Sequence, residues 1–201
     1  MAALARPNLW IFAGPNGSGK STFYTRTRIV ENGDPLWIIN PDVLTYEIAA
    51  RESLDWLVAN GRALDRIKLW LEAAVDMYKP VGVETVLSSE KYIPLIDTAL
   101  TRGFDVRLIY VALQTPQLHI DRVRKRVAEG GRDVDPEKIV ARRIRSFEML
   151  QRVYPKASFA QIWDNSGDAP QLLFEKNGPE TQMFLPDAIP EITDRIRAVT
   201  G

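Results

Sequence analysis

The chain has 201 residues, 45% hydrophobic and 26% charged, which is ordinary for a globular protein and fits one domain over residues 1–201. Its 26 basic residues balance 26 acidic residues, which argues against a protein that coats nucleic acid or a membrane surface. The absence of cysteine excludes disulfides, thiolate nucleophiles and cysteine-based zinc sites. The apolar run within the first ten residues is too short for a membrane span and lacks a signal-peptide cleavage pattern, so we expect a cytoplasmic protein.

Short apolar segments alternate with helical patterns along the chain. In chain order the pattern predicts a strand at 9–13, a helix at 21–30, a strand at 36–39, two helices separated at Asn60 and Gly61, a strand at 81–87, a helix at 92–102, a strand at 106–113, helices at 116–128 and 136–150, strands at 159–163 and 172–175, and a helix at 190–199. Most strands are apolar on both faces. This predicts an α/β three-layer sandwich with a mainly parallel sheet of five or six strands, whose ligands bind beyond the carboxyl ends of the strands.

The first strand runs into a glycine-rich segment that fits G-x-x-x-x-G-K-[ST] at each specified position. The segment comprises Gly14, Pro15, Asn16, Gly17, Ser18, Gly19, Lys20 and Ser21. Glycines let backbone N–H groups point at an anion, and the following helix adds partial positive charge. Lys20 is expected to reach the β- and γ-phosphates, Ser21 to supply a hydroxyl ligand to Mg²⁺, and Thr22 to complete the nucleotide site. The motif predicts a P-loop NTPase fold, and the lack of an Asn-Lys-x-Asp segment favours ATP over GTP.

Two acidic residues lie at or near the ends of predicted strands. Asp42 follows the second strand, where a carboxylate is suited to accept the proton of a phosphoryl acceptor; a helix N-cap is the alternative. Glu84 falls inside the third strand, where a carboxylate is costly unless it is paired or faces a site. We expect it beside a substrate hydroxyl or the magnesium ion, and a structural ion pair with an arginine is the alternative.

Residues 116–150 are rich in arginine, whose fork meets the charge of a transferring phosphoryl group. The seven arginines are Arg122, Arg124, Arg126, Arg132, Arg142, Arg143 and Arg145. We expect a helical lid at about 116–150 with a hinge at Gly130 and Gly131, and two or three of these arginines on the nucleotide. At the end of the fifth strand, Asn165 or its neighbour Asp164 is expected beside the adenine, with a polar turn as the alternative. His119 is the single histidine and is expected to pack or lie on a helix surface rather than to bind metal.

Taken together, these segments resemble the zeta toxin family of P-loop small-molecule kinases over residues 8–166. The resemblance is carried by residues 11–22, by Asn40-Pro41-Asp42, by Glu84 and Thr85, and by the arginine-rich segment that ends at 130–134. It implies a kinase that phosphorylates a nucleotide sugar such as UDP-N-acetylglucosamine and that a small antitoxin neutralises. It also implies that Asp42 is the base, that Glu84 and the adjoining Thr85 bind substrate, and that Arg122 and Arg132 contact the γ-phosphate, with Arg126 as an alternative to Arg132.

Within the single kinase-like domain, the helical segment at about 43–79 is expected to be an insertion. Two other functions fit the same residues. One is a different metabolic or antibiotic P-loop phosphotransferase, and the other is a non-enzymatic switch protein that binds ATP and a partner.

Overall fold

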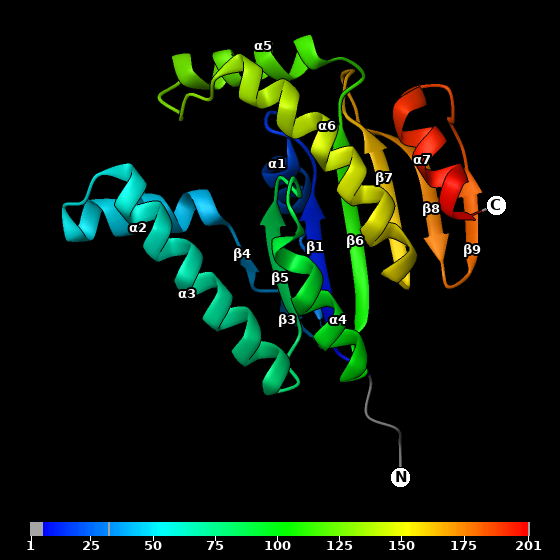
Figure 1. The fold of residues 1–201 in the computed structure, drawn as a ribbon, viewed down its shortest axis with the longest axis horizontal. Helices are drawn as coiled ribbons and strands as arrows, with labels where there is room; N and C mark the ends of the chain where they lie inside the picture. Colours follow the sequence, from blue (N-terminus) through cyan, green and yellow to red (C-terminus); the bar gives the residue numbers. More distant parts are fainter. Residues whose placement is uncertain (1–5, 32, 201) are drawn as a thin grey trace.

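A mostly parallel β-sheet runs through the computed structural model, which describes residues 6–31 and 33–200 (Figure 1). In sheet order its strands are β4 (Ile38–Ile39), β5 (Val81–Thr85), β1 (Asn8–Ala13), β6 (Asp105–Ala112), β7 (Phe159–Asp164), β8 (Gln171–Asn177) and β9 (Glu180–Met183). The first five strands are parallel to one another. Strand β8 pairs antiparallel with β7, and β9 pairs antiparallel with β8. The expected α/β fold is confirmed. Within the described residues the sheet has seven strands rather than five or six, because the chain turns back at Gly178 and β9 pairs with β8.

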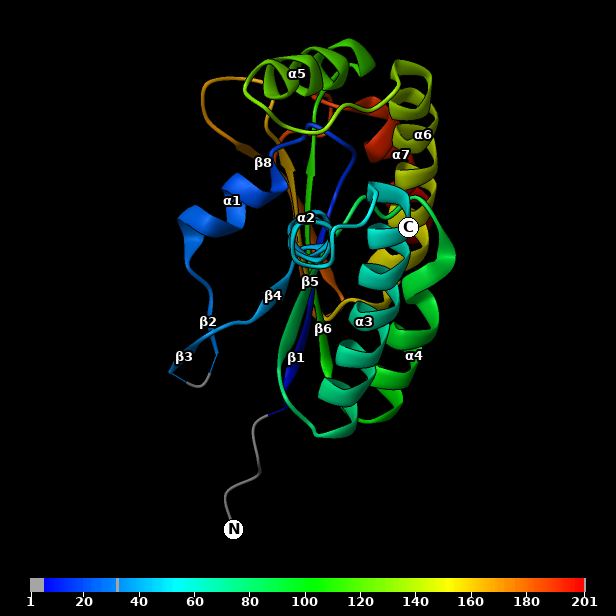
Figure 2. The same cartoon turned by 90° about the vertical axis from the view of Figure 1, so that its left-hand side faces the viewer.

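Helices cover both faces of this sheet and one of its ends. They are α1 (Lys20–Thr27), α2 (Pro41–Glu52), α3 (Trp56–Asp76), α4 (Ile93–Thr101), α5 (Pro116–Ala128), α6 (Pro136–Val153) and α7 (Pro190–Thr200), with short 3₁₀ turns η1 (Glu90–Tyr92) and η2 (Tyr154–Lys156). Figure 2 shows α1 and the small hairpin of β2 (Val30–Glu31) and β3 (Asp34–Pro35) on one face, and α3, α4, α6 and α7 on the other. Helix α5 lies across the carboxyl end of the sheet, above the turn that follows β1.

Strand β1 divides its side chains between two hydrophobic clusters, as the alternation of a strand requires. Leu9 and Ile11 join the larger cluster, which also takes side chains from α3, α4, α6 and α7. Trp10 and Phe12 join a smaller cluster on the face that α1 covers. Strand β1 is therefore buried on both faces in the interior of the sheet, and the turn that follows it starts from this buried strand.

The two helices between β4 and β5 divide at a different place from the one expected. A break at Asn60 and Gly61 is wrong, because α3 continues through both residues. Helix α2 ends at Glu52, and Ser53 follows in the left-handed conformation. Asp55 then starts α3, and its side chain accepts hydrogen bonds from the backbone N–H groups of Leu57 and Val58. This cap, together with the apolar face that α3 buries, outweighs the turn preference of the Asn-Gly pair.

Strand β1 lies between β5 and β6, and the chain visits β4 and β5 on one side before it crosses to β6 on the other. Such a reversal of direction opens a crevice at the carboxyl ends of the central strands. The predicted phosphate loop, the Asn40–Asp42 segment and α5 all meet at this edge (Figure 1). The fold therefore brings the motifs that the sequence singles out to one place.

None of the helices within the described ranges is both long enough and apolar enough to cross a bilayer. The expectation that the first ten residues contain no leader falls partly on residues 1–5, which lie outside the described residues.

Candidate active site

The turn between β1 and α1 is shaped to hold an anion. Gly14, Gly17 and Gly19 all have positive φ values, of 142°, 74° and 91°. A Cβ atom on Gly14 would lie 2.0 Å from the carbonyl oxygen of Val111, so the loop packs against β6 in a way that only glycine permits. The Ser18 hydroxyl is buried and finds no hydrogen-bond partner among the described residues. A glycine cradle with an unpaired hydroxyl at the N-terminus of α1 fits a phosphate chain.

Lys20 folds back over this loop. Its Nζ atom donates a hydrogen bond to the carbonyl oxygen of Pro15 at 3.2 Å and lies 3.9 Å from Oε1 of Glu84. Burial lowers the pKa of the Lys20 ammonium, while the carboxylates of Glu84 and Asp42 oppose that shift. The lysine is therefore held beside the loop by a carbonyl and a carboxylate, both of which a phosphate oxygen can replace.

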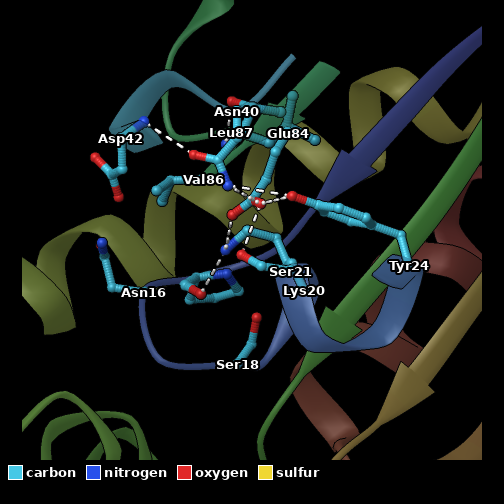
Figure 3. Close-up of polar contacts among 12 residues, drawn as sticks. Asn16, Ser18, Lys20, Ser21, Tyr24, Asn40, Asp42, Glu84, Val86 and Leu87 are labelled. Carbon is cyan, nitrogen blue, oxygen red and sulfur yellow. Dashed lines mark hydrogen bonds and ion pairs between the residues drawn. The ribbon is translucent and has the colours of Figure 1, made fainter. Parts of the chain in front are cut away.

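Glu84 stands at the centre of a hydrogen-bond network (Figure 3). In the pairing of β5 with β1, Glu84 lies opposite Phe12, and this position places its carboxylate next to the start of α1. Oε2 of Glu84 accepts hydrogen bonds from Ser21 Oγ at 2.8 Å, Tyr24 OH at 2.8 Å and Asn40 Nδ2 at 2.7 Å. Burial first, and the neighbouring Glu84 second, raise the pKa of Tyr24 to about 12, so the phenol donates. The cation of the described chain within ion-pair distance of Glu84 is Lys20, not an arginine.

Ser21 and Glu84 fit a magnesium ion bound together with phosphates. Within the described residues no group of three or more histidine, aspartate and glutamate side chains could hold a metal ion by itself. Magnesium in phosphate sites does not need such a group, because one or two carboxylates and the substrate phosphates are its usual partners. The Ser21 hydroxyl and the Glu84 carboxylate lie 2.8 Å apart, so the protein can offer both oxygens to one magnesium ion beside the phosphates.

Asp42 lies at the start of α2 and is not its N-cap. The cap is Asn40, whose Oδ1 accepts from the backbone N–H groups of Asp42 at 2.9 Å and Val43 at 3.2 Å. The Asp42 side chain is 60% exposed, and its Oδ1 lies 3.7 Å from Nη1 of Arg132. Because this side chain is exposed, a hydroxyl group in the space in front of the helix can reach its carboxylate.

That space is a cleft of about 590 Å³ between the starts of α2 and α3 and the segment that follows α5. Its lining residues are Asp42, Val43, Tyr46, Trp56, Arg126, Gly130, Gly131 and Arg132. The Arg132 guanidinium lies 4.6 Å from the centre of the Trp56 ring, and Arg126 Nη2 donates to the Arg132 carbonyl at 3.0 Å. The cleft thus combines one carboxylate, two arginines and two aromatic rings.

Arg122 and Asn165 lie on the opposite flank of the phosphate loop. Arg122 Nη2 donates to the Asn165 carbonyl at 2.6 Å, and Asn165 Nδ2 donates to the Ser18 carbonyl at 2.8 Å. Asn165 therefore clamps the loop with its side chain. It also lines a smaller hollow of about 190 Å³ next to α1, which Thr22 shares. The structure places both residues beside the loop.

The remaining expected residues divide between the site and the rest of the fold. Thr85 follows Glu84, and its hydroxyl accepts a hydrogen bond from the Leu87 N–H group. Arg143 is buried and pairs with Glu191 of α7 at 2.9 Å, which makes it part of the packing between α6 and α7. Arg124 is exposed and lies 3.8 Å from Asp121 of its own helix. Of the arginines in the segment, the structure thus brings Arg122, Arg126 and Arg132 to the site.

Three side chains of this site make contacts that sequence reasoning missed, although His119 does pack, as one of its two expected roles. Asn40 belongs to the Asn40-Pro41-Asp42 motif, and the pattern of a cap residue followed by proline indicates its role at the start of α2. Tyr24 lies three residues after Ser21, on the same face of α1, which is the one local sign of its contact with Glu84. His119 is fully buried, and its Nδ1 lies 2.7 Å from the Asn16 carbonyl of the phosphate loop. Nothing in its helical pattern points to that contact.

Comparison with known proteins places the chain in a wider group. The sequence model of the family described as AAA domain matches residues 9–150. An uncharacterised protein of Haemophilus influenzae is 28% identical over 137 residues, which are 64% of this chain and 91% of that protein. Among solved structures, AvrRxo1-ORF1:-ORF2 with ATP matches with a TM-score of 0.69 at 20% identity, over 98% of this chain and 66% of the other. The PezAT chromosomal toxin-antitoxin system of Streptococcus pneumoniae matches with a TM-score of 0.61 at 15% identity, over 81% of this chain and 69% of the other.

These structural similarities establish the fold, which is that of P-loop kinase-like proteins. The present chain spans somewhat less than two thirds of the AvrRxo1 chain that it matches.

Proposed function

The chain belongs to the AAA domain family, and we propose that it is a zeta-toxin-like kinase that transfers the γ-phosphate of ATP to a hydroxyl group of a small molecule. One observation carries the proposal: an exposed carboxylate, Asp42, lies 3.7 Å from an arginine, Arg132, and both line a cleft at the end of the sheet that holds the phosphate loop. A nucleotide-binding loop alone has no need of that arrangement, whereas phosphoryl transfer requires both a proton acceptor and cations at the reacting phosphate.

In this proposal the phosphate loop binds the triphosphate of ATP, and Lys20 exchanges its contact with the Pro15 carbonyl for phosphate oxygens. Ser21 and Glu84 would hold Mg²⁺, which would neutralise the charge that develops on the phosphates. Thr22 and Asn165 flank the nucleoside side of the site. Arg122, whose guanidinium would lie 3.9 Å from a Cβ atom on Gly19, approaches the phosphates from α5.

The acceptor binds in the cleft with its hydroxyl group at Asp42. The Asp42 carboxylate accepts the hydroxyl proton as the oxygen forms its bond to the γ-phosphorus. The bond from that phosphorus to the β,γ-bridging oxygen breaks, and ADP leaves with the bonding electrons. Lys20, Arg126 and Arg132 stabilise the charge on the transferring group. The products are ADP and a phosphate ester, with the proton on Asp42 released afterwards to solvent.

The resemblance to zeta toxins makes UDP-N-acetylglucosamine the first acceptor to test. The cleft contains two aromatic side chains, Trp56 and Tyr46, and the latter is 70% exposed. The uracil ring of such an acceptor can stack on these aromatic surfaces. We further propose α2 and α3 as the helical insertion and α5 and α6 as the lid. A small antitoxin is the proposed protein partner, since the similar PezAT structure is that of a toxin-antitoxin system.

The test compares wild-type protein with Asp42→Ala, and uses Glu47→Ala on the same helix as the control. Glu47 is exposed and does not line the cleft. Transfer of labelled phosphate from ATP to the acceptor is expected to fall by a factor on the order of 10² to 10⁴ in Asp42→Ala only, because a general base supplies about that much. Calorimetry is expected to show unchanged ATP binding in both variants. Undiminished transfer by Asp42→Ala contradicts the proposed base.

The choice of acceptors separates the alternatives. Failure of UDP-N-acetylglucosamine together with transfer to another hydroxyl compound decides for a different metabolic or antibiotic phosphotransferase. A conformational response to ATP without transfer to any acceptor decides for a switch protein.

A further inference from the structure

We propose that Asn40 is a positioning residue that holds the acceptor side and the phosphate side of the site in one fixed geometry. This inference rests on the proposed kinase function. It gives a role to Asn40, which takes no direct part in the proposed phosphoryl transfer. Asn40 comes directly after β4 and caps α2. The oxygen of its side-chain amide contacts the first turn of α2, and the nitrogen of the same amide contacts Glu84.

The oxygen end serves the acceptor side. Oδ1 accepts hydrogen bonds from the Asp42 and Val43 N–H groups, which fixes the first turn of α2. The Asp42 side chain is exposed, and its ion pair in the described chain is the 3.7 Å contact with Arg132. Asn40 therefore anchors the backbone from which the Asp42 carboxylate projects.

The nitrogen end serves the phosphate side (Figure 3). Nδ2 donates to Glu84 Oε2 at 2.7 Å and lies 3.1 Å from Tyr24 OH, which itself donates to Glu84 at 2.8 Å. Ser21 Oγ meets the same carboxylate oxygen at 2.8 Å. Asn40 and Tyr24 thus orient the carboxylate that binds the proposed magnesium ligand Ser21.

An amide is suited to this double role because it carries an acceptor and a donor on one rigid group. Serine or aspartate would cap α2 equally well, but neither offers an amide N–H to Glu84. Asp55 shows what a simple cap looks like in the same chain: its Oδ1 accepts from Leu57 N at 2.9 Å and Val58 N at 3.1 Å, much as Asn40 does for α2. The difference between the two caps is the contact with Glu84.

The experiment uses the full chain and three variants. Asn40→Ser keeps a capping oxygen and removes the amide donor. Tyr24→Phe removes the hydroxyl group and keeps the ring, which packs on Phe12 with ring centres 5.2 Å apart. Asp55→Ala removes the cap of α3 and leaves the Glu84 network untouched. For each, the Mg²⁺ concentration that gives half-maximal ATP binding is measured by calorimetry, and the unfolding midpoint is measured without ligand.

Asn40→Ser is expected to raise the required Mg²⁺ concentration by roughly 10- to 100-fold, as the loss of a partner to a metal-site residue does. Tyr24→Phe should raise it in the same direction, and both should keep an unfolding midpoint close to that of the wild type. Asp55→Ala should lower the midpoint and leave the Mg²⁺ requirement unchanged.

A wild-type Mg²⁺ requirement in Asn40→Ser overturns this inference and leaves the proposed kinase function standing, since Asn40 is then only a cap. Wild-type protein that binds ATP with no dependence on Mg²⁺, or binds no ATP, overturns the inference together with the magnesium-dependent function on which it rests.

Discussion

His119 gives the most tightly constrained prediction, because it is the single histidine of the chain. Its side chain is fully buried, and Nδ1 lies 2.7 Å from the Asn16 carbonyl, so in the neutral ring Nδ1–H donates to the phosphate loop. Burial lowers the pKa of His119 from 6.5 to about 4, with a further contribution from nearby cations of which Arg143 is the largest. The folded protein therefore keeps this histidine neutral over a pH range in which the unfolded chain protonates it.

The direction and size of the effect follow from proton linkage. Between pH 6.5 and 4 the unfolded state binds a proton at this position that the folded state does not, so acid favours unfolding. The contribution to stability is complete above pH 6.5 and is lost as the pH falls toward 4. Applied to pKa values of 6.5 and about 4, linkage gives a loss of about 2 kcal/mol between pH 7.5 and pH 5.

Urea unfolding of wild-type protein and His119→Asn at pH 7.5, 6.5, 5.5 and 5 measures this directly. Asparagine places an amide N–H near the position of Nδ1, so the bond to the Asn16 carbonyl is kept while the titration is removed. The variant is expected to be less stable throughout because its side chain is smaller. Its free energy of unfolding should nevertheless fall by about 2 kcal/mol less than that of the wild type between pH 7.5 and 5. Equal slopes for the two proteins refute the assignment of a buried neutral histidine.

Three further predictions concern the loop, the cleft and α3. Arg132→Ala should lower phosphate transfer by roughly 100-fold or more in steady-state assays, while Arg124→Ala, which removes an exposed partner of Asp121, should change it little; equal effects would contradict the role of the cleft. Gly14→Ala should abolish ATP binding in calorimetry and cost about 2 kcal/mol or more in urea unfolding, because its Cβ would lie 2.0 Å from a backbone oxygen. Gly61→Ala should stabilise the protein by about 0.5–1 kcal/mol, since it lies inside α3 with open space around it; a loss of stability there would count against the helix.

The features that were predictable from the sequence are those with local causes. The strand before Gly14, the glycine loop and the Lys20 helix each follow from residues within one short segment. The alternation of apolar strands with helices is also local, and it was enough to predict a mainly parallel sheet. Strand β9 carries four residues that are mostly exposed, so no apolar pattern marks it.

The features that were not predictable depend on contacts across the fold. The Asn-Gly pair at 60–61 favours a turn locally, yet the buried stripe of α3 on either side of it decides the helix. Glu84 was recognisable as a carboxylate inside an apolar strand, but its partners come from α1 and from the start of α2, 44 to 63 residues away. The contact between His119 and Asn16 spans 103 residues. Only the assembled sheet brings these groups together.

The most direct test of the account follows the terminal phosphate of ATP itself. Protein, Mg²⁺ and ATP labelled with ¹⁸O in the γ-phosphate are incubated with a small-molecule extract, and the products are identified by mass spectrometry. We expect an acceptor that gains a labelled phosphoryl group with wild-type protein and does not gain it with Asp42→Ala. An extract in which the label appears solely in inorganic phosphate, or in which both proteins label the same acceptor equally, would contradict it.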